Sequence, residues 1–498
     1  MQYKYNKNTD SLELVNRNSI IVNNVVSSGS SGNSTNGDAV ITITTETPEF
    51  YGKQVILTDG ENSITTLFSN EGIAIFKGVE MEGKLTASVT IDENIYTTNI
   101  EIKSNYKINF NPENYYTFTV RLDWSDENSA TWGTWLDDAQ TILTMPPRDS
   151  EGGYGESFLD EFMGYYPCTL DSQGNEIDVL NPNNYAKTIN GNDLQESTRV
   201  MVKFKNRGYR IWNDPDNSNY TYVSITNRPG LAGYEYIKYK NQLVDSFYVG
   251  AYQGTVDDKG RLLSKSGAAP SVSKSLSDFR NYAHNNGTNF EQFTFNIYTY
   301  LCCCAVIKYR GETLRNALGY GYVRSSYGLD PSGNRNEHGL NWGKYNNMKD
   351  VKLFGIENLW GNVTTFVEGI AISSDSHYRY STGPFSNDFS TYTDLGSTSL
   401  QLPSQENFFI DGLIATDSRL GFMPSKGTPC NGLNDTSYDN KYLATTAYQN
   451  KQGSKVCFQG CEYNYGSSAN LIRTAFFLGP DESYGYTGAR LVYFKPVS

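Results

Sequence analysis

Hydrophobic and polar residues alternate near the start of the chain. From Leu85 to Ile91 apolar side chains alternate with threonine and serine, and shorter alternations occur at residues 41–44 and 100–103. A period of two residues places the apolar side chains on one buried face of a β-strand. Turn sequences such as Asp59-Gly60 separate these runs. Residues 38–104 are therefore predicted to form a small β-sandwich, and none of their residues suggests chemistry.

Residues 1–37 lack a pattern that would build a core. Ser27 to Gly37 reads Ser-Ser-Gly-Ser-Ser-Gly-Asn-Ser-Thr-Asn-Gly, a composition typical of flexible linkers. We expect either a mobile tether or an attachment arm that becomes ordered when it docks on a larger assembly.

A helical period marks two stretches in the remainder of the chain. Ser275 is a candidate N-cap, with Asp278 three residues later as in a capping box, and Gly287 is predicted to end this helix. Its inner face is predicted to carry Leu276, Phe279 and Ala283.

The second predicted helix spans roughly Phe290 to Tyr309. Apolar residues recur every four positions in it, at Phe293, Ile297, Leu301 and Ala305. A helix with such a broad apolar face is mostly buried. The adjacent cysteines of this helix, Cys302, Cys303 and Cys304, are interpreted as small buried hydrophobic residues.

Six segments, in a fixed order, resemble a known family. They are Thr117–Asp123 with Trp135–Ala139, Pro167–Leu170 with Leu180–Lys187, Val200–Phe204, Val244–Tyr252, Phe354–Val363 and Gly488–Tyr493. The series is similar to phage structural proteins, usually tail-fibre or minor virion proteins. The large domain of those proteins has the fold of formylglycine-generating enzymes, a variant of the C-type lectin fold. The resemblance covers about residues 115–498, more than three quarters of the chain.

The resemblance implies an α+β fold with an all-β N-terminal module. Residues 38–104 resemble the bacterial immunoglobulin-like modules that serve as spacers in surface and phage proteins. An attachment arm and linker (1–37) and this β-sandwich would precede a loop-rich head domain (105–498). The head would contain a central twisted antiparallel sheet, two packed helices and long loops.

Residues 354–363, called the motif loop below, carry the fold motif of the family. The motif residues are Glu357, Asn358, Trp360, Gly361 and Asn362. Glycines at 355 and 361 allow tight turns, and the carboxylate and amide side chains are expected to hold loop amides by hydrogen bonds. The same oxygens suit a structural calcium ion, which is the alternative; no other cofactor is expected. The family commonly continues with an aromatic stretch containing Trp, whereas residues 364–369 here read Thr-Thr-Phe-Val-Glu-Gly.

Composition argues against two classes of partner. The chain has 54 Asp and Glu residues against 41 Lys and Arg, a net charge of −13, so it lacks a general footprint for nucleic-acid phosphates. No run approaches the roughly 20 apolar residues of a membrane-spanning helix, and the N-terminus lacks the apolar run of a signal peptide. We expect no nucleic-acid partner and no membrane insertion. We also expect the protein to be synthesised in a cytoplasm.

No enzymatic activity is expected, although enzymes of this fold hold copper with two cysteines near the C-terminus. Cys457 and Cys461 lie in a comparable region, and two thiolates would suit Cu(I). Their spacing is one residue shorter than in the enzymes, and Cys461 stands at a turn position of the Gly-Gly-x-Trp-x-x-Gly pattern of the phage proteins. A disulfide or a metal site among these two and Cys430 stays open.

Other catalytic constellations are weaker. His284, His338 and His377 are far apart in the sequence and show no metal-ligand spacing; His284 is interpreted as a helix C-terminal cap. A glycan depolymerase would need two suitably separated carboxylates, which the sequence does not locate.

Tyrosine, asparagine, serine and glycine dominate the last third of the chain. Rigid tyrosines combined with adaptable small polar residues are typical of recognition loops. Tyr438, Tyr463 and Tyr465 are therefore the candidate ligand-binding residues, and ordinary solvated loops are the alternative.

These observations lead to the hypothesis of a phage virion protein on the particle surface, made in the host bacterial cytoplasm. As a head fibre or tail fibre it would attach to other virion proteins through its N-terminal arm and form a homotrimer by family analogy. Its head would bind a host surface glycan or protein through many weak contacts. The alternative is a purely structural virion joint, or a capsid decoration protein, without a host ligand.

Overall fold

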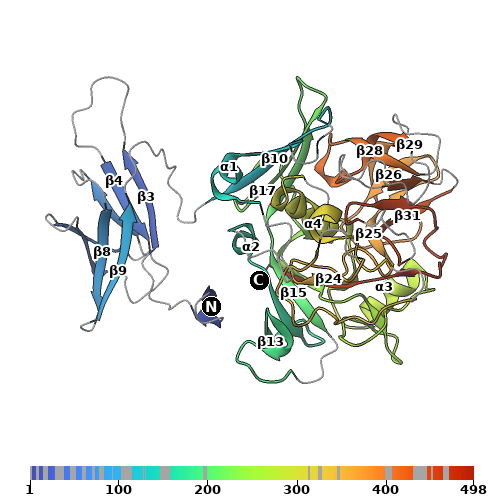
Figure 1. Cartoon of the computed structure of the whole chain (residues 1–498), viewed down its shortest axis with the longest axis horizontal. Helices are drawn as coiled ribbons and strands as arrows, with labels where there is room; N and C mark the ends of the chain where they lie inside the picture. The colour runs from blue at the N-terminus through green and yellow to red at the C-terminus, as the bar shows by residue number, and fades with distance from the viewer. Residues whose placement is uncertain are drawn as a thin grey trace. The chain divides into compact units, whose positions relative to one another are not determined.

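The chain forms two compact units, Met1–Tyr115 and Tyr116–Ser498, in the computed structural model. Both are rich in β-strands, and helices are few (Figure 1). The structure describes residues 52–58, 63–69, 74, 86–90, 115–126, 128, 131–145, 158–194, 199–311, 314–323, 328–344, 348–398, 408, 410–429, 453–463 and 470–497, and the backbone alone of strand residues 3–6, 11–14, 21–27, 39–44, 73, 75–77, 84–85, 91, 94–101, 407, 409 and 446–449.

The described part of the first unit contains two antiparallel sheets and a hairpin. The strands are β1 (Tyr3–Asn6), β2 (Ser11–Leu14), β3 (Ile21–Ser27), β4 (Ala39–Thr44), β5 (Gln54–Thr58), β6 (Ser63–Leu67), β7 (Ile73–Lys77), β8 (Lys84–Ile91) and β9 (Asn94–Glu101). One sheet has the order β3-β4-β7, the other has the order β6-β5-β8-β9, and β1 pairs with β2.

The predicted alternation in this unit is confirmed at β8. Ala87 and Val89 are buried, whereas Thr90 between the strand's apolar positions is exposed. Strand β3 lies inside residues 1–37 and pairs with β4, so this sheet begins within the segment predicted as arm and linker. Backbone pairing across the sheet, which a local composition cannot reveal, accounts for the difference.

Three larger sheets occur in the described part of the second unit. Their orders are β11-β10-β17-β16, then β14-β13-β12-β15-β19-β34-β22 with β18 beside β19, and β27-β26-β25-β31-β32-β30-β28-β29 with β33 beside β25. The strands are β10 (Thr117–Asp123), β11 (Gly133–Leu136), β12 (Tyr166–Leu170), β13 (Glu176–Asn181), β14 (Asn184–Thr188), β15 (Val200–Lys205), β16 (Gly208–Asn213), β17 (Tyr220–Thr226), β18 (Lys238–Tyr239), β19 (Gln242–Gly250), β22 (Phe290–Gln292), β25 (Thr364–Ile372), β26 (His377–Tyr380), β27 (Thr393–Ser397), β28 (Asn407–Leu413), β29 (Pro424–Pro429), β30 (Thr446–Gln449), β31 (Lys455–Gln459), β32 (Thr474–Phe476), β33 (Thr487–Gly488) and β34 (Leu491–Pro496). Short ribbons are formed by β20 (Thr255–Val256) with β21 (Leu262–Leu263) and by β23 (Lys352–Leu353) with β24 (Ile356–Glu357).

Among the described residues of the second unit, one helix is long and the others are short. They are α1 (Asp137–Ile142), α2 (Phe158–Met163), α3 (Leu276–His284), α4 (Phe295–Lys308) and α5 (Leu314–Leu318), with a 3₁₀ turn, η2 (Ser418–Leu420). The predicted capping box of α3 is confirmed, because the Ser275 hydroxyl accepts from the Asp278 N–H and the Asp278 carboxylate accepts from the Ser275 N–H. Its inner face is buried as predicted, but the helix ends at His284, before Gly287.

The prediction of a helix over 290–309 is wrong at its start. Phe290–Gln292 form β22, which pairs with β34, and α4 begins only at Phe295. Every residue of α4 is buried, including the three adjacent cysteines, so their interpretation as buried hydrophobic residues is confirmed. The helix packs against β10 and β17 on one side and β25 on the other, which makes it the centre of the core (Figure 1).

A buried ion pair joins α2 to α4. The Lys308 ammonium lies 2.7 Å from each carboxylate oxygen of Asp160, and both side chains are at most 4% exposed. The Tyr165 hydroxyl donates a further hydrogen bond to Asp160. Lys308 and Tyr165 thus donate three hydrogen bonds to the desolvated carboxylate, which a charge in a protein interior requires as compensation.

Candidate functional site

The side chains of the motif loop hold backbone groups of a neighbouring loop, as predicted. The Glu357 carboxylate accepts from the N–H groups of Gly333 and Arg335 at 2.8 and 2.9 Å. Asn362 is fully buried, accepts from the Asp330 N–H and donates to the Asp330 carbonyl, both at 2.9 Å. The motif loop is therefore a rigid, hydrogen-bonded frame.

Asn358 continues this network. Its side chain accepts from the Val351 N–H and donates to the Asp350 carboxylate at 2.6 Å. The backbone of Asn358 is left-handed, with φ of 50°, and Asn362 has φ of 67°. Asparagine tolerates this conformation better than most residues, which accounts for an asparagine at both turns.

Burial perturbs two charged groups beside the frame. Desolvation and the Asp350 carboxylate raise the pKa of Glu357 to about 7, against the two N–H groups that lower it. Desolvation lowers the pKa of Lys352 to about 7, and its ammonium donates to the carbonyls of Arg335 and His338. Burial therefore favours the neutral form of both the Glu357 carboxyl and the Lys352 amine.

Arg490 joins three of the six segments that carry the family resemblance. Its buried guanidinium donates to the carbonyl oxygens of Gly250, Glu357 and Asn358, each at 2.8 Å. Burial lowers the pKa of Arg490 to about 9. The C-terminal Gly-Ala-Arg, the end of β19 and the motif loop are thus bound together by one side chain.

The side-chain oxygens of Glu357, Asn358 and Asn362 all accept from backbone N–H groups. Within the described residues, no group of three or more His, Cys, Asp or Glu side chains is placed to hold a metal ion. The hydrogen bonds of Glu357, Asn358 and Asn362 instead give these side chains the structural role predicted first.

Of the three predicted ligand-binding tyrosines, the structure describes Tyr463. Tyr438 and Tyr465 lie outside the described residues. Tyr463 is half-buried, and its N–H donates to the Asn362 carbonyl at 3.1 Å. Its ring packs edge-on against Tyr486 with centroids 5.2 Å apart. Tyr463 is therefore hydrogen-bonded directly to the motif loop.

Tyr463 belongs to an aromatic row that the sequence analysis missed in part. Tyr486 packs edge-on against Tyr484 at 5.6 Å, and Tyr484 against Phe477 at 5.8 Å. We call Tyr463, Tyr486 and Tyr484 the tyrosine row. A hydrogen bond to Tyr486 raises the pKa of the Tyr463 hydroxyl, and Tyr484 is 39% exposed. The Tyr-Gly-Tyr sequence at 484–486 has the same spacing as Tyr463 and Tyr465. This spacing is the sequence signal that could have identified the other tyrosines of the row.

The candidate thiols are buried. Desolvation raises the pKa of both Cys457 and Cys461, which favours the neutral thiol over the thiolate that binds copper. No disulfide joins these two residues in the described part of the chain, and Cys430 lies outside it. In the absence of a bound metal, both residues are therefore neutral thiols of the protein interior.

The three histidines occupy separate environments. His284 is the last residue of α3, whose C-cap is Asn285, and its Nε2 lies 2.7 Å from the Glu291 carboxylate. His377 contacts Asp394 at 2.8 Å, and the His338 ring packs on Trp342 with centroids 4.8 Å apart.

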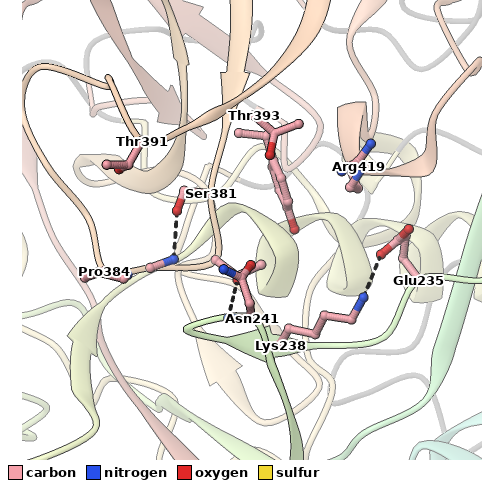
Figure 2. Close-up of a pocket in the computed structure, with 11 residues that line it drawn as sticks. Glu235, Lys238, Asn241, Ser381, Pro384, Thr391, Thr393 and Arg419 are labelled. Atoms are coloured by element: carbon pink, nitrogen blue, oxygen red, sulfur yellow. Dashed lines mark hydrogen bonds and ion pairs between the residues drawn. The ribbon is translucent and has the colours of Figure 1, made fainter.

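A polar cavity of about 300 Å³ lies elsewhere in the second unit (Figure 2). Its walls come from three places in the sequence: the β18–β19 hairpin and the residues before it, the end of β26 with the following loop and β27, and η2. The lining residues are Glu235, Lys238, Asn241, Tyr380, Ser381, Thr382, Gly383, Pro384, Thr391, Thr393 and Arg419. No sequence motif indicated this cavity.

Comparisons with known proteins give no family assignment. No protein-family model matches the chain, and no curated protein was found to be similar. In the parts of the chain that the structure describes, none of the helices has the length and apolar character needed to cross a membrane.

Proposed function

We propose that this chain is a phage virion surface protein, a head fibre or tail fibre, whose second unit is a C-type-lectin-like, formylglycine-generating-enzyme-like head. The head binds a host surface glycan or glycoprotein. The first unit contains an immunoglobulin-like spacer, and the N-terminal residues attach to other virion proteins. Trimeric copies multiply weak contacts into avidity.

The tyrosine row is the observation that carries this proposal. Exposed tyrosine offers a rigid ring face for stacking on a sugar and a hydroxyl for hydrogen bonding. Tyr463 is attached to the motif loop, and the Thr364 N–H, which follows that loop, donates to the Tyr486 carbonyl at 3.1 Å. A recognition surface held on a rigid frame loses little conformational entropy on binding.

Binding of the purified chain to a glycan array and to host cells tests the proposal. We expect wild-type protein to bind and Tyr484→Ala to bind at least about tenfold more weakly, since one ring contact contributes of the order of 1 kcal/mol or more. Tyr484→Phe, which keeps the ring, should retain most binding. Tyr282→Ala on α3 removes a half-buried tyrosine outside the row and serves as the control. Equal binding by wild type and Tyr484→Ala would contradict the proposal.

A structural joint without a host ligand is the second candidate, and one observation favours it. Leu243 and Val497 are 49% and 60% exposed, and the register Val244 to Pro496 makes them neighbours at the end of two paired strands. Exposed apolar neighbours suit a contact with another virion subunit. Analytical ultracentrifugation of Leu243→Ser with Val497→Ser would show whether this contact maintains an oligomer.

A further inference from the structure

We propose that the polar cavity binds one neutral, hexose-sized sugar. This site is separate from the tyrosine row. Strand β25 begins at Thr364, beside the tyrosine row, and its Ile370 pairs with Tyr380 at the cavity. Six residues of extended strand span roughly 20 Å. The inference rests on the proposed function only for the source of the sugar, a host surface polysaccharide.

The two main walls of the cavity are fixed to each other. Lys240 and Asn241 form a two-residue hairpin turn with φ of 51° and 62°, as in a type I′ turn. The Lys240 N–H donates to the Thr382 carbonyl at 2.8 Å, and the Asn241 N–H donates to the Thr382 hydroxyl at 3.0 Å. That hydroxyl donates back to the Asn241 side chain at 3.1 Å. Residues 141 positions apart are thereby locked together, so the cavity is formed before a ligand arrives.

Charges in and beside the cavity are balanced. The Lys238 ammonium faces the Glu235 carboxylate at 3.8 Å, a longer separation than that of a closed ion pair. Asp417 binds Nε and Nη2 of Arg419, with a shortest distance of 2.6 Å. An ionic ligand would have to compete with one of these pairs, whereas a neutral ligand would not. The long Glu235–Lys238 separation leaves hydrogen-bonding capacity on both groups for such a ligand.

The distribution of the lining groups fits a sugar ring. Figure 2 shows Glu235, Lys238 and Arg419 together on one side and Ser381, Pro384 and Thr391 on the other. Carboxylate acceptors, cationic donors and hydroxyls can satisfy the several hydroxyls of a hexose, each of which needs a partner when it leaves water. An apolar ligand would leave these protein groups without partners. A volume of about 300 Å³ is at the small end of ligand pockets and suits one ring.

Saturation-transfer difference NMR and calorimetry on the full chain test this site, with glucose, galactose, mannose, N-acetylglucosamine and glucuronate as probes. At least one neutral hexose should bind with a Kd of the order of 1 mM. Glu235→Gln removes the charge but keeps the shape and should weaken binding roughly tenfold, and Thr393→Val on β27 should do the same by removing one hydroxyl. Glu161→Gln alters an exposed carboxylate on α2 that is not among the residues lining the cavity, so this variant should bind the sugar as wild type does.

The outcomes separate the two proposals. Failure of every neutral hexose to bind, binding of glucuronate alone, or equal binding by wild type and both cavity variants would overturn the cavity proposal. Tyr484→Ala should retain hexose binding in the cavity. If Tyr484→Ala loses array binding while Glu235→Gln keeps it and no hexose binds, the cavity proposal fails and the tyrosine-row proposal stands.

Discussion

The backbone N–H of Tyr463 donates to the carbonyl oxygen of Asn362 over 3.1 Å, so the tyrosine row begins on the motif loop. Asn362 is itself fully buried and hydrogen-bonded through its side chain. The position of a surface ring therefore depends on a buried polar network. Recognition residues carried by loops on a rigid scaffold are a common arrangement for binding proteins.

Replacement of Asn362 should destabilise the second unit. Its side chain has three partners, the N–H and carbonyl of Asp330 and the Gln253 amide, which Asn362→Gly removes while keeping the left-handed backbone. We expect a loss of about 2–4 kcal/mol in the free energy of unfolding, measured by urea denaturation. Asn362→Ala should cost about 1 kcal/mol more than Asn362→Gly because its Cβ disfavours positive φ. Variants as stable as wild type would show that the network does not hold the loop.

Replacement of Arg490 by lysine should destabilise the second unit. A lysine ammonium cannot reproduce the planar fork that reaches the carbonyls of Gly250, Glu357 and Asn358. We expect Arg490→Lys to lower the free energy of unfolding by about 2–4 kcal/mol, since it leaves buried carbonyls unsatisfied. Arg261→Lys, at a partly exposed arginine whose guanidinium pairs with Asp257 at 2.6 Å, is the comparison and should cost less because its charge stays in contact with water. The reverse order would contradict the role assigned to Arg490.

The Asp160–Lys308 pair should show strong coupling. Either Asp160→Asn or Lys308→Met removes one charge of this buried pair, and we expect each substitution to lower the free energy of unfolding by about 3–5 kcal/mol. The double variant leaves no isolated charge, so its loss should be smaller than the sum of the single losses. Thermal and urea unfolding of the four proteins gives this coupling. Strict additivity would mean that the two charges do not interact as their 2.7 Å contacts indicate.

Stability should depend on pH through His284. The hydrogen bond to Glu291 raises the pKa of His284 above its ordinary value of 6.5, although burial opposes it. The folded state then binds the proton more tightly than the unfolded state, so this stabilisation is complete below pH 6.5 and lost as the pH rises through the folded pKa. Melting temperatures from about pH 6 to about pH 8 should fall less steeply for His284→Gln than for wild type. Parallel curves would contradict this assignment.

Local sequence signals predicted the features that depend on neighbouring residues. The capping box at Ser275 and Asp278 and the alternation in β8 were predictable because each arises within one helical turn or one strand. The three residues Phe290–Gln292, which read Phe-Glu-Gln, fit either a helix or a strand, and their pairing with β34, two hundred positions later, decides for the strand. That contact has no local signature.

The candidate site was predictable only in part for the same reason. The motif loop and Tyr463 were found from the family resemblance and from loop composition. The polar cavity was not, because Glu235, Thr382 and Arg419 come together only through long-range pairing. Tyr484 and Tyr486 were missed since a tyrosine-rich loop does not reveal which of its rings share a surface.

Electron microscopy of intact phage particles that contain this chain would show where the tyrosine row lies. With the chain located in the map, we predict that the tyrosine row projects into solvent and that the N-terminal residues contact other virion proteins. A row buried against capsid or tail subunits would contradict the adhesive function and leave a structural joint.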